Sequence, residues 1–566
     1  MNRQAILHIP DSQYCYALAC DRVELRLRTS SEDVFSEVDV VYGNKYDYHL
    51  KRERAVMQKQ FSDGTFDYYF VRLSLKDVRF VYVFELHERE KIYYVSEDGV
   101  SESYDFKLAY YNSFQLPYIN RSDVMPEVEW MKSAVFYEIF IDRFFRGDTQ
   151  KEDAYINLKW GDLPHPKSFA GGDLAGIRQK LGYLKGLGVT ALYLTPVFCS
   201  VSNHKYDIYD YYEIDPQFGT KEELRGLVKE AHALGIRIVM DAVFNHCSER
   251  FPYFQDVLRN GKDSPYFDWF IIRGEKVDAE KCNYECFAAC TYMPKLNLSN
   301  EQAKAYFIDV ALYWIREYGI DGWRLDVSDE ISHDFWHDFR KAVKAYDRDI
   351  VIIGENWHDA RPYLCGDEYD GIMNYAVTKA LLDFFAKKTL DAKQFAERMS
   401  ALYVRNTRQV NNMMLNLLDS HDTHRFYTET GKDTDALLCA LAVIFLHTGA
   451  ACLYYGTEIA LEGGYDPDCR RTMDWEAAEK GTKIQDLVRR LASLRRKEAV
   501  RSGEIAFSWE DGIFILERRG ESVLRLYVDR SGGHRCVPQG EVLLAYGWEG
   551  GVFTGTGFMI EEVAYE

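Results

Sequence analysis

The stretch IRIVMDAVFNH (residues 236–246) is a short, mostly apolar run that ends in polar residues. Such a run, rich in β-branched side chains, is typical of a strand buried inside a parallel sheet. The preceding stretch, EELRGLVKEAHALG (222–235), has the apolar spacing of an amphipathic helix. A helix that leads into a buried strand is the repeating unit of an α/β fold with parallel strands.

The same unit recurs along the chain. Further strands are expected at AVFYEIF (134–140), ALYLTP (191–196), DGWRLD (321–326), IVIIGE (350–355), GIMNY (371–375), MLNLLD (414–419) and ACLYYG (451–456). Helical patterns lie between them, for example at 301–319, and a last helix is expected at 484–500. Eight strands with intervening helices over about 370 residues predict a (β/α)8 TIM barrel.

The flanking segments have a different pattern. Residues 1–122 contain alternating runs such as 23–28, 66–75 and 79–86, which predict an N-terminal β-sandwich. We expect the catalytic barrel at 123–500. A small inserted domain is expected after the third strand, at about 247–300, because that gap is too long for a loop. Residues 501–566 return to a strand pattern and predict a small C-terminal β domain.

Composition excludes several classes of function. The chain has 566 residues, 89 acidic and 69 basic, and a formal net charge of −20, which argues against nucleic acid or an anionic membrane as a partner. The apolar stretch 436–453 is broken by His447 and Gly449, so we interpret it as a buried helix followed by a strand. The first residues lack the pattern of a signal peptide, and we expect a cytoplasmic protein whose 12 cysteines are reduced.

A Cys-x3-Cys-x3-Cys pattern at 282–290 raises the alternative of a metal site. Its spacing matches neither zinc-ribbon pairs nor the usual cluster motifs, and no fourth ligand is evident. We therefore expect no metal and no cofactor.

Polar side chains follow four of the expected barrel strands, and in this fold the carboxyl ends of the strands form the active face. The candidates are Asp241 and His246 after the third strand, Arg324 and Asp326 in the fourth, Glu355 after the fifth, and His421 and Asp422 after the seventh. One such acid alone could be structural, pairing with an arginine or capping a helix. Several acids with an arginine and two histidines at one mouth predict a catalytic site.

The pattern matches the needs of glycosidic bond cleavage, which uses one ionised and one protonated carboxyl group. Arg324 and Asp326 are two residues apart on a strand and face the same way, so the cation should keep Asp326 ionised. Glu355 ends a very apolar strand, and burial should raise its pKa and make it the proton donor. Asp422 is then a third carboxylate that orients the substrate.

Four segments carry a resemblance to a known family. DAVFNH (241–246), GWRLDVSDE (322–330), ENWH (355–358) and LDSHD (418–422) resemble the signature segments of the α-amylase family, glycoside hydrolase family 13. MPKLN (293–297) resembles a fifth segment, typical of the neopullulanase, cyclomaltodextrinase and maltogenic amylase subgroup. SNHKYD (202–207) and ACLYYGTEI (451–459) also match. The N-terminal region resembles the starch-binding-like domain of that subgroup.

The resemblance implies a role for each matched residue. Asp326 is implied as the nucleophile, Glu355 as the general acid/base and Asp422 as the third acid. The implied substrate-binding residues are Arg324, His246, His421, Tyr206, His204, Asp241, Glu330, Trp357, Phe287, Asp468 and Arg470. Outside these motifs, Tyr206 and Phe287 would be read as core aromatics, and Asp468 with Arg470 as a surface ion pair.

Two positions depart from the family pattern. Relatives often bind calcium near the first strand, but here the segment reads DRFFRGDTQKED (142–153). Arg146 and Lys151 bring cations where oxygen ligands are expected, so we predict no calcium there. Asn356 stands where relatives usually carry an aliphatic residue, which leaves open the linkage preference and the balance of hydrolysis against transfer.

The sequence thus predicts a retaining α-glycosidase that acts on α-1,4-glucosidic bonds in cyclodextrins and maltooligosaccharides, with pullulan or starch as further substrates. The resemblance also implies a homodimer in which one chain's N-terminal domain narrows the neighbour's cleft. The alternatives are a 4-α-glucanotransferase or a general α-amylase of the same family, a non-catalytic partner of a transporter, and a metal-dependent barrel hydrolase. The last usually carries His-x-His at the first strand, where this chain reads FYEIFID (136–142).

Overall fold

The computed structural model describes residues 1–564, which form two compact units. Among the described residues, the larger unit comprises 128–389, 412–504 and 518–564. The smaller comprises residues 1–127, 390–411 and 505–517.

The larger unit is built on eight parallel strands. In chain order they are β11 (Val135–Ile139), β12 (Ala191–Leu194), β15 (Arg237–Ala242), β16 (Gly322–Leu325), β17 (Val351–Gly354), β18 (Gly371–Ile372), β19 (Leu415–Leu417) and β20 (Ala450–Tyr454). Neighbours in the chain are neighbours in the sheet, and β11 also pairs with β20. A parallel bridge between Met373 and Leu415 joins β18 to β19 and closes the ring. The predicted TIM barrel is confirmed.

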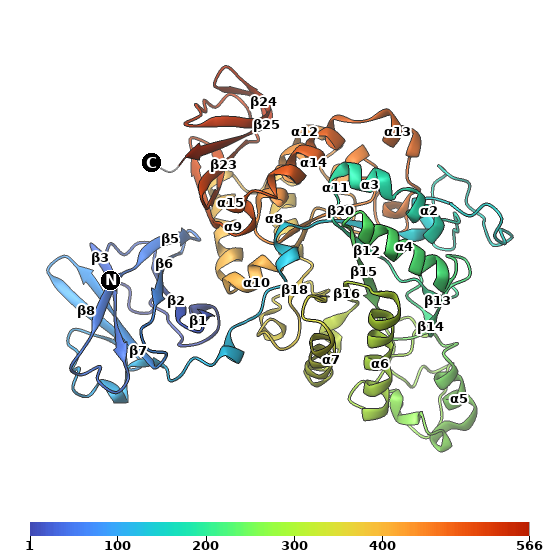
Figure 1. The fold of residues 1–566 in the computed structure, drawn as a ribbon, viewed down its shortest axis with the longest axis horizontal. Coiled ribbons are helices and arrows are strands. Elements are labelled where there is room, and N and C mark those ends of the chain that lie inside the picture. Colours follow the sequence, from blue (N-terminus) through green and yellow to red (C-terminus); the bar gives the residue numbers. More distant parts are fainter. Residues whose placement is uncertain (565–566) are drawn as a thin grey trace. The chain divides into compact units, whose positions relative to one another are not determined.

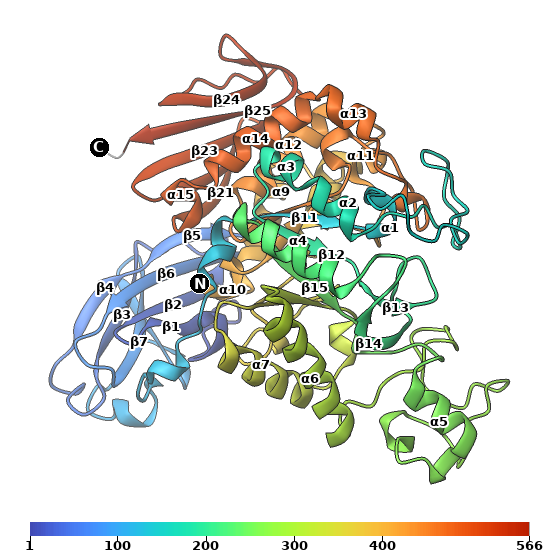
Figure 2. The same cartoon turned by 45° about the vertical axis from the view of Figure 1, so that its right-hand side comes forward.

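Helices alternate with these strands (Figures 1 and 2). The helices are α3 (Leu181–Leu187), α4 (Lys221–Ala233), α6 (Glu301–Tyr318), α7 (His333–Tyr346), α8 (Tyr375–Leu381), α12 (Thr434–Leu446) and α14 (Lys483–Leu494). Helix α4 shows why the pattern folds this way. Thr220 and Glu223 form a capping box at its start, and its apolar residues, three and four apart, are buried on one face.

The last predicted helix, 484–500, is shorter than expected. Helix α14 ends at Leu494, and a separate short helix, α15 (Glu498–Arg501), follows. Arg495 is fully buried and donates hydrogen bonds to the main-chain carbonyls of Phe445, Lys132 and Gly449. Because these carbonyl oxygens hold the Arg495 guanidinium, the chain leaves helix α14 at this residue.

The apolar stretch 436–453 folds as predicted into a buried helix and then a strand, α12 and β20. Residues 436–446 of α12 are all buried within the protein. Nowhere in residues 1–564 does a helix combine the length and the apolar character that crossing a membrane requires.

The segment between β15 and α6 forms the predicted insertion. It contains α5 (Pro252–Asn260) and otherwise short bridges, such as Phe270 with Leu296 and Cys286 with Pro294. Both views place α5 in a small lobe beyond one end of α6 (Figures 1 and 2). A bridge between His246 and Lys295 holds the insertion to the end of β15.

The smaller unit contains the predicted N-terminal sandwich. One antiparallel sheet has the order β1 (Cys15–Ala19), β2 (Arg22–Ser30), β6 (Phe66–Ser74), β5 (Gln58–Ser62). The other has β4 (Glu53–Val56), β3 (Glu37–Asn44), β7 (Phe80–Glu88), β8 (Lys91–Ser96), β9 (Gly99–Ser101), with β10 (Phe114–Leu116) beside β7. Alternate residues of both sheets, such as Leu25 of β2 and Phe84 of β7, share one core. The unit also holds α9 (Ala392–Val404) and α10 (Arg408–Asn412).

The C-terminal region consists of strands, as predicted, and those strands pair antiparallel. Strand β25 (Val552–Ala564) pairs with β23 (Ser522–Asp529) on one side and β24 (Glu541–Glu549) on the other. Strands β21 (Glu504–Glu510) and β22 (Ile513–Arg519) precede them. The remaining elements of the barrel region are α1 (Ile141–Phe144), α2 (Leu174–Gln179), β13 (Phe198–Ser200), β14 (Ile208–Ile214), α11 (Phe426–Glu429) and α13 (Trp475–Lys480).

The segment after β11 holds a buried ammonium group. The Nζ atom of Lys151 lies 2.8 Å from Oδ2 of Asp173 and donates to the carbonyls of Gly171 and Gln217, also at 2.8 Å. The Lys151 side chain is 9% exposed. Three oxygens around one cation are the kind of environment that a calcium ion also requires, and here a lysine supplies the positive charge.

Replacing Lys151 with Met should destabilise the protein, because the Asp173 carboxylate stays buried without its cation. Breaking such a buried pair costs about 3–5 kcal/mol in the free energy of unfolding. Thermal and urea unfolding of Lys151→Met measure the loss, with Lys159→Met as the control, since Lys159 is exposed. Equal stability of the two variants would contradict this role for Lys151.

Candidate active site

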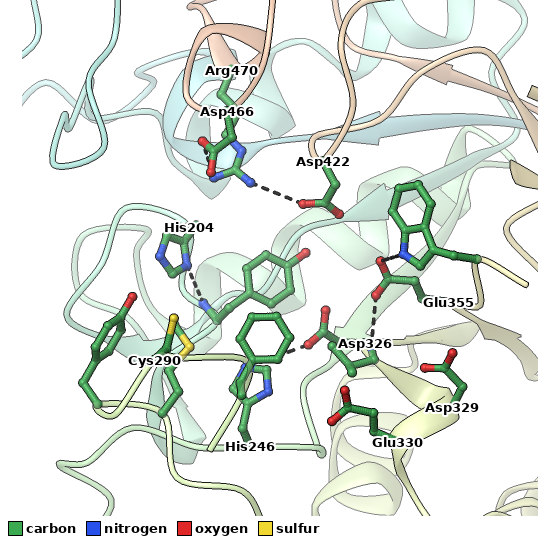
Figure 3. A pocket seen from close by; sticks show the side chains of 16 residues that line it. His204, His246, Cys290, Asp326, Asp329, Glu330, Glu355, Asp422, Asp466 and Arg470 are labelled. Atoms are coloured by element: carbon green, nitrogen blue, oxygen red, sulfur yellow. Dashed lines mark hydrogen bonds and ion pairs between the residues drawn. The ribbon is translucent and has the colours of Figure 1, made fainter. Parts of the chain in front are cut away.

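A cavity of about 530 Å³ opens at the carboxyl ends of the barrel strands. Figure 3 shows carboxylates and imidazoles pointing into it from several strand ends. Ten of the residues predicted from the sequence line it: His204, Tyr206, His246, Phe287, Asp326, Glu330, Glu355, Trp357, Asp422 and Arg470. Three more, Asp241, Arg324 and His421, are buried against these residues, as the contacts below show. The structure therefore gathers most of the predicted site.

The Arg324 guanidinium occupies the floor of the site. Its Nη1 lies 2.8 Å from Oδ1 of Asp326 and 3.1 Å from both carboxylate oxygens of Asp241. Its Nη2 lies 2.8 Å from Oε2 of Glu355 and 3.9 Å from Oδ2 of Asp422. Burial disfavours the charge, but these carboxylates hold the pKa of Arg324 well above its usual value. One guanidinium thus fixes the spacing of Asp326 and Glu355.

The two oxygens of Asp326 have different surroundings. Oδ1 is held by Arg324, whereas Oδ2 is buried without a hydrogen-bond partner and lies 4.0 Å from Nε2 of His246. Val327, the next residue, has a φ of 44°, which a β-branched residue rarely adopts. This turn directs its N–H to Oε2 of Glu355 at 3.0 Å. Asp326 therefore presents one oxygen that is free to react.

Glu355 is held at both oxygens. Oε2 faces Arg324 and the N–H of Val327, so it meets only donors. Oε1 accepts a hydrogen bond from Nε1 of Trp357 at 3.1 Å. The Trp357 ring stacks on Tyr375, with centroids 3.7 Å apart and planes at 6°. Oε2 thus meets two donors, whereas Oε1 meets one. The proton of neutral Glu355 therefore belongs on Oε1.

Burial raises the pKa of both Asp326 and Glu355, and Arg324 opposes the shift at each. Arg324 favours the ionised form of Asp326, as expected, while desolvation raises the pKa of this carboxyl group. The neighbouring carboxylates add to the effect of burial: Glu355 raises the pKa of Asp326, and Asp422 raises that of both groups.

His421 is a cation held between two acids. Its Nδ1 lies 2.6 Å from Oε1 of Glu138, and its Nε2 lies 3.0 Å from Oδ2 of Asp422. Burial lowers the pKa of His421, but Asp422 and Glu138 raise it to about 10. Burial likewise opposes ionisation of Asp422, yet His421, Arg470 and Arg324 bring its pKa below the usual value. Asp422 is therefore ionised at neutral pH.

Glu138 was not predicted. It lies on β11 and is fully buried. The signal in the sequence was a lone glutamate inside the apolar strand AVFYEIF, since a buried carboxylate requires a partner.

Asp241 is held by two tyrosines. Tyr193 donates to its Oδ2 at 2.7 Å and Tyr206 at 2.9 Å. Tyr206 also lies 2.6 Å from Nε2 of His421 and stacks beside that ring at 10°. Tyr206 therefore couples Asp241 to His421 while its ring faces the cavity.

The other two histidines of the site are neutral. Burial lowers the pKa of His204 to about 4, and burial with Lys295 lowers that of His246 to about 3. The His246 ring stacks on Phe287, with centroids 4.7 Å apart. Neutral imidazoles both donate and accept hydrogen bonds, as sugar hydroxyl groups require.

Arg470 lies on the cavity as predicted, but Asp468 does not. Nη2 of Arg470 lies 3.3 Å from Oδ1 of Asp422, and Nη1 lies 3.0 Å from Asp466. Asp468 turns away because Arg471 binds both of its oxygens, at 2.7 and 2.9 Å. Asp466 is thus the acid beside Arg470 on the cavity wall.

The insertion supplies wall residues that sequence reasoning missed. Cys290, Tyr292 and Met293 line the cavity together with Phe287. Lys295 donates to Asn245 and to the carbonyl of Glu330, which ties the insertion to the segment after β16. Val327 and Asp329 of that segment complete the wall. Met293, Val327 and Asp329 lie within the quoted motifs and Cys290 ends the cysteine pattern, but only the fold shows that these residues line the cavity.

Two buried carboxyl groups held on one guanidinium, at the mouth of a (β/α)8 barrel, have the arrangement that glycosidic bond cleavage requires. Residues 138–512 match the family described as "Alpha amylase, catalytic domain", and residues 1–120 match "Alpha amylase, N-terminal ig-like domain". The chain belongs to the α-amylase family.

Relatives support this assignment along the chain. A cyclomaltodextrinase of Geobacillus thermopakistaniensis is 41% identical, over 95% of this chain and 93% of its own. An intracellular maltogenic amylase of Bacillus subtilis is 40% identical, over 90% of this chain and 87% of its own. A solved structure of a cyclomaltodextrinase is 35% identical with a TM-score of 0.90, covering 100% of this chain and 98% of that one.

The hydrogen bond from Trp357 to Glu355 predicts a measurable shift. Trp357→Phe keeps an aromatic ring over Tyr375 but removes the N–H that favours ionised Glu355. The pKa of the acid should rise, and the alkaline limb of the kcat/KM profile should move up by about 1 pH unit. A pH–rate profile measures the shift, with Tyr292→Phe as a control on the same cavity. An unmoved limb would show that Trp357 does not act on Glu355.

Proposed function

We propose that the chain hydrolyses α-1,4-glucosidic bonds in cyclodextrins and short maltooligosaccharides, with retention of anomeric configuration. Asp326 is the nucleophile, Glu355 the general acid/base and Asp422 the third acid. The relatives named cyclomaltodextrinase and maltogenic amylase support this substrate class. The observation that carries the assignment is that Oδ2 of Asp326 has no hydrogen-bond partner, while one guanidinium contacts both Asp326 and Glu355.

The first step forms a covalent intermediate. Oδ2 of Asp326 attacks the anomeric carbon while Oε1 of Glu355 gives its proton to the glycosidic oxygen. The bond to the leaving sugar breaks, and its electrons stay on the protonated oxygen. The N–H of Trp357 stabilises the carboxylate that this transfer leaves on Glu355.

The second step reverses the roles. Ionised Glu355 takes a proton from water, and the water oxygen attacks the anomeric carbon from the side that the leaving group vacated. Asp326 departs as a carboxylate, which Arg324 stabilises. Two inversions give net retention. Ionised Asp422 and neutral His246 are placed to bind hydroxyl groups of the sugar at the cleaved bond.

The walls of the cavity support small or cyclic substrates. Phe287 and Tyr292 enclose it from the insertion, and Trp357 faces it from the segment after β17. Aromatic rings with a few charged groups are suited to stacking on sugar rings.

A product time course tests this proposal, with β-cyclodextrin and soluble starch as parallel substrates. We expect fast ring opening to short maltooligosaccharides and slower attack on starch. Asp326→Asn should lose at least about 10⁴-fold in kcat, as removing a covalent nucleophile does. Asp263→Asn, an exposed aspartate that does not line the cavity, is the matched control and should retain activity. Inert cyclodextrin with rapid starch cleavage would instead indicate a general α-amylase.

A 4-α-glucanotransferase would share every residue described above. Asn356, buried beside Glu355, keeps this alternative open because it stands on the acceptor side of the implied cleft. The same time course separates the two. Glucose and maltose that accumulate with reducing ends indicate hydrolysis, whereas longer chains with constant reducing ends indicate transfer.

We also infer that the protein is a cytoplasmic homodimer with a starch-binding-like N-terminal domain. The Bacillus subtilis relative named intracellular supports the location. In the N-terminal domain, a hollow of about 480 Å³ is lined by exposed Tyr46 and Tyr110 and by polar groups such as Gln115. Exposed aromatic rings of this kind fit either a sugar or a partner chain.

Light scattering after size-exclusion chromatography tests the dimer. We expect a mass of twice 66.0 kDa at micromolar concentration. Paired substitution of Tyr46 and Tyr110 with Ala, both on the surface of the sandwich, should shift the mass towards the monomer if this hollow contacts the partner. A wild-type protein that stays monomeric at high concentration would contradict the dimer.

A further inference from the structure

A cluster of imidazoles and carboxylates lies outside the cavity, on α7 and the segment before β18. His333 and His337 are four residues apart on α7, so they share one face of the helix. They face Asp367 and Glu368, which follow the short helix η8 (Arg361–Tyr363). No motif of the sequence analysis includes these four residues.

The ligand atoms lie at distances that suit a tetrahedral metal ion. Nε2 of His337 lies 3.1 Å from Oδ2 of Asp367 and 3.5 Å from Oε1 of Glu368. One ligand atom from each of these three residues lies within 4.8 Å of the other two. With zinc–ligand bonds near 2.0–2.1 Å, neighbouring ligands of a tetrahedral site are about 3.3 Å apart. The observed distances bracket that value.

Glu368 adds a second, independent observation. It is 2% exposed, and its Oε2 is buried without a hydrogen-bond partner. Its Oε1 lies 2.7 Å from Nδ1 of His333. Within residues 1–564, the ion pairs of the Asp367 and Glu368 carboxylates are all with the imidazoles of His333 and His337. A buried carboxylate in this position is stabilised by a cation.

A second group of side chains has similar geometry but already has a cation beside it. Glu37, Asp39 and His87 also lie close enough to hold an ion. There, Arg54 already lies 3.1 Å from Asp39 and 2.5 Å from Glu85, so a guanidinium provides the positive charge. The α7 group has no such cation among the described residues.

We propose that His337 Nε2, Asp367 Oδ2 and Glu368 Oε1 bind a divalent transition metal of the zinc class. His333 orients Glu368 through its hydrogen bond, as second-shell partners of metal ligands do. Imidazole with carboxylate favours zinc over calcium, which takes oxygen ligands only. The ion links two segments. One is helix α7, which comes after Asp326 in the chain, and the other is the segment that comes after Glu355. The site is separate from the proposed hydrolysis, and it departs from our expectation of no metal.

Isothermal titration of the full chain with ZnCl2, after removal of metals with EDTA, tests the proposal. We expect one zinc ion bound at micromolar affinity or tighter, and at least a tenfold loss of affinity in His337→Ala and in Asp367→Asn. Both residues are exposed, so these variants should fold. His165→Ala, an exposed histidine on another loop, is the matched control and should bind as the wild type does.

Two further readouts separate this site from zinc on the catalytic carboxylates. Cobalt(II) in place of zinc should give a visible absorption band of an imidazole-bound ion that His337→Ala abolishes. Zinc should raise the melting temperature of the wild type and of Asp326→Asn, but not of His337→Ala. The proposal is wrong if wild type fails to bind zinc at 100 μM, or if His337→Ala binds it with unchanged affinity. Neither result depends on the activity of the enzyme.

Discussion

The buried guanidinium of Arg324 is the interaction on which the site depends. A charge removed from water is costly unless opposite charges surround it, and Asp241, Asp326 and Glu355 do so here at 2.8 to 3.1 Å. Asp241 lies near the end of β15, Asp326 follows β16, which carries Arg324, and Glu355 follows β17. Because one rigid planar group contacts all three, it sets the separation of the two reacting carboxyl groups.

The electrostatics of the site follow from an excess of carboxylates over cations in a buried place. His421 balances two of them by staying protonated between Glu138 and Asp422. Burial raises the pKa of both Asp326 and Glu355, and Arg324 opposes the shift at each. Glycosidic cleavage uses such an arrangement, since one group must attack as a carboxylate and the other must give a proton.

The barrel also explains why the wall of the cavity and the proposed metal cluster involve the same chain segments. The segment after β16 carries Asp326 and then α7, and the segment after β17 carries Glu355 and Trp357 and then Glu368. Contacts made by α7 and Glu368 therefore involve the same segments that position Asp326 and Glu355. The insertion after β15 has a similar relation to the cavity, because Lys295 ties it to Asn245 and Glu330.

The sequence by itself determined the barrel and the residues that we propose as reacting groups. Eight apolar strands with amphipathic helices between them allow few other folds, and a parallel barrel brings every carboxyl end to one face. The polar residues at those ends, such as Asp326 and Glu355, were therefore predictable. The N-terminal sandwich followed from alternation of apolar and polar residues, and the helix at 434–446 from its polar flanks.

Only the tertiary structure decided which neighbours these residues meet. Asp466 rather than Asp468 lies on the cavity because Arg471, three residues further on, captures Asp468. Glu138 of β11 reaches His421 in the segment after β19, and burial raises the pKa of Asp326 against the effect of Arg324. His337 meets Glu368 through the packing of a helix on a loop. These contacts depend on how far apart the residues lie in the chain or on how deeply they are buried. No local sequence pattern marks either property, so the sequence alone does not determine the contacts.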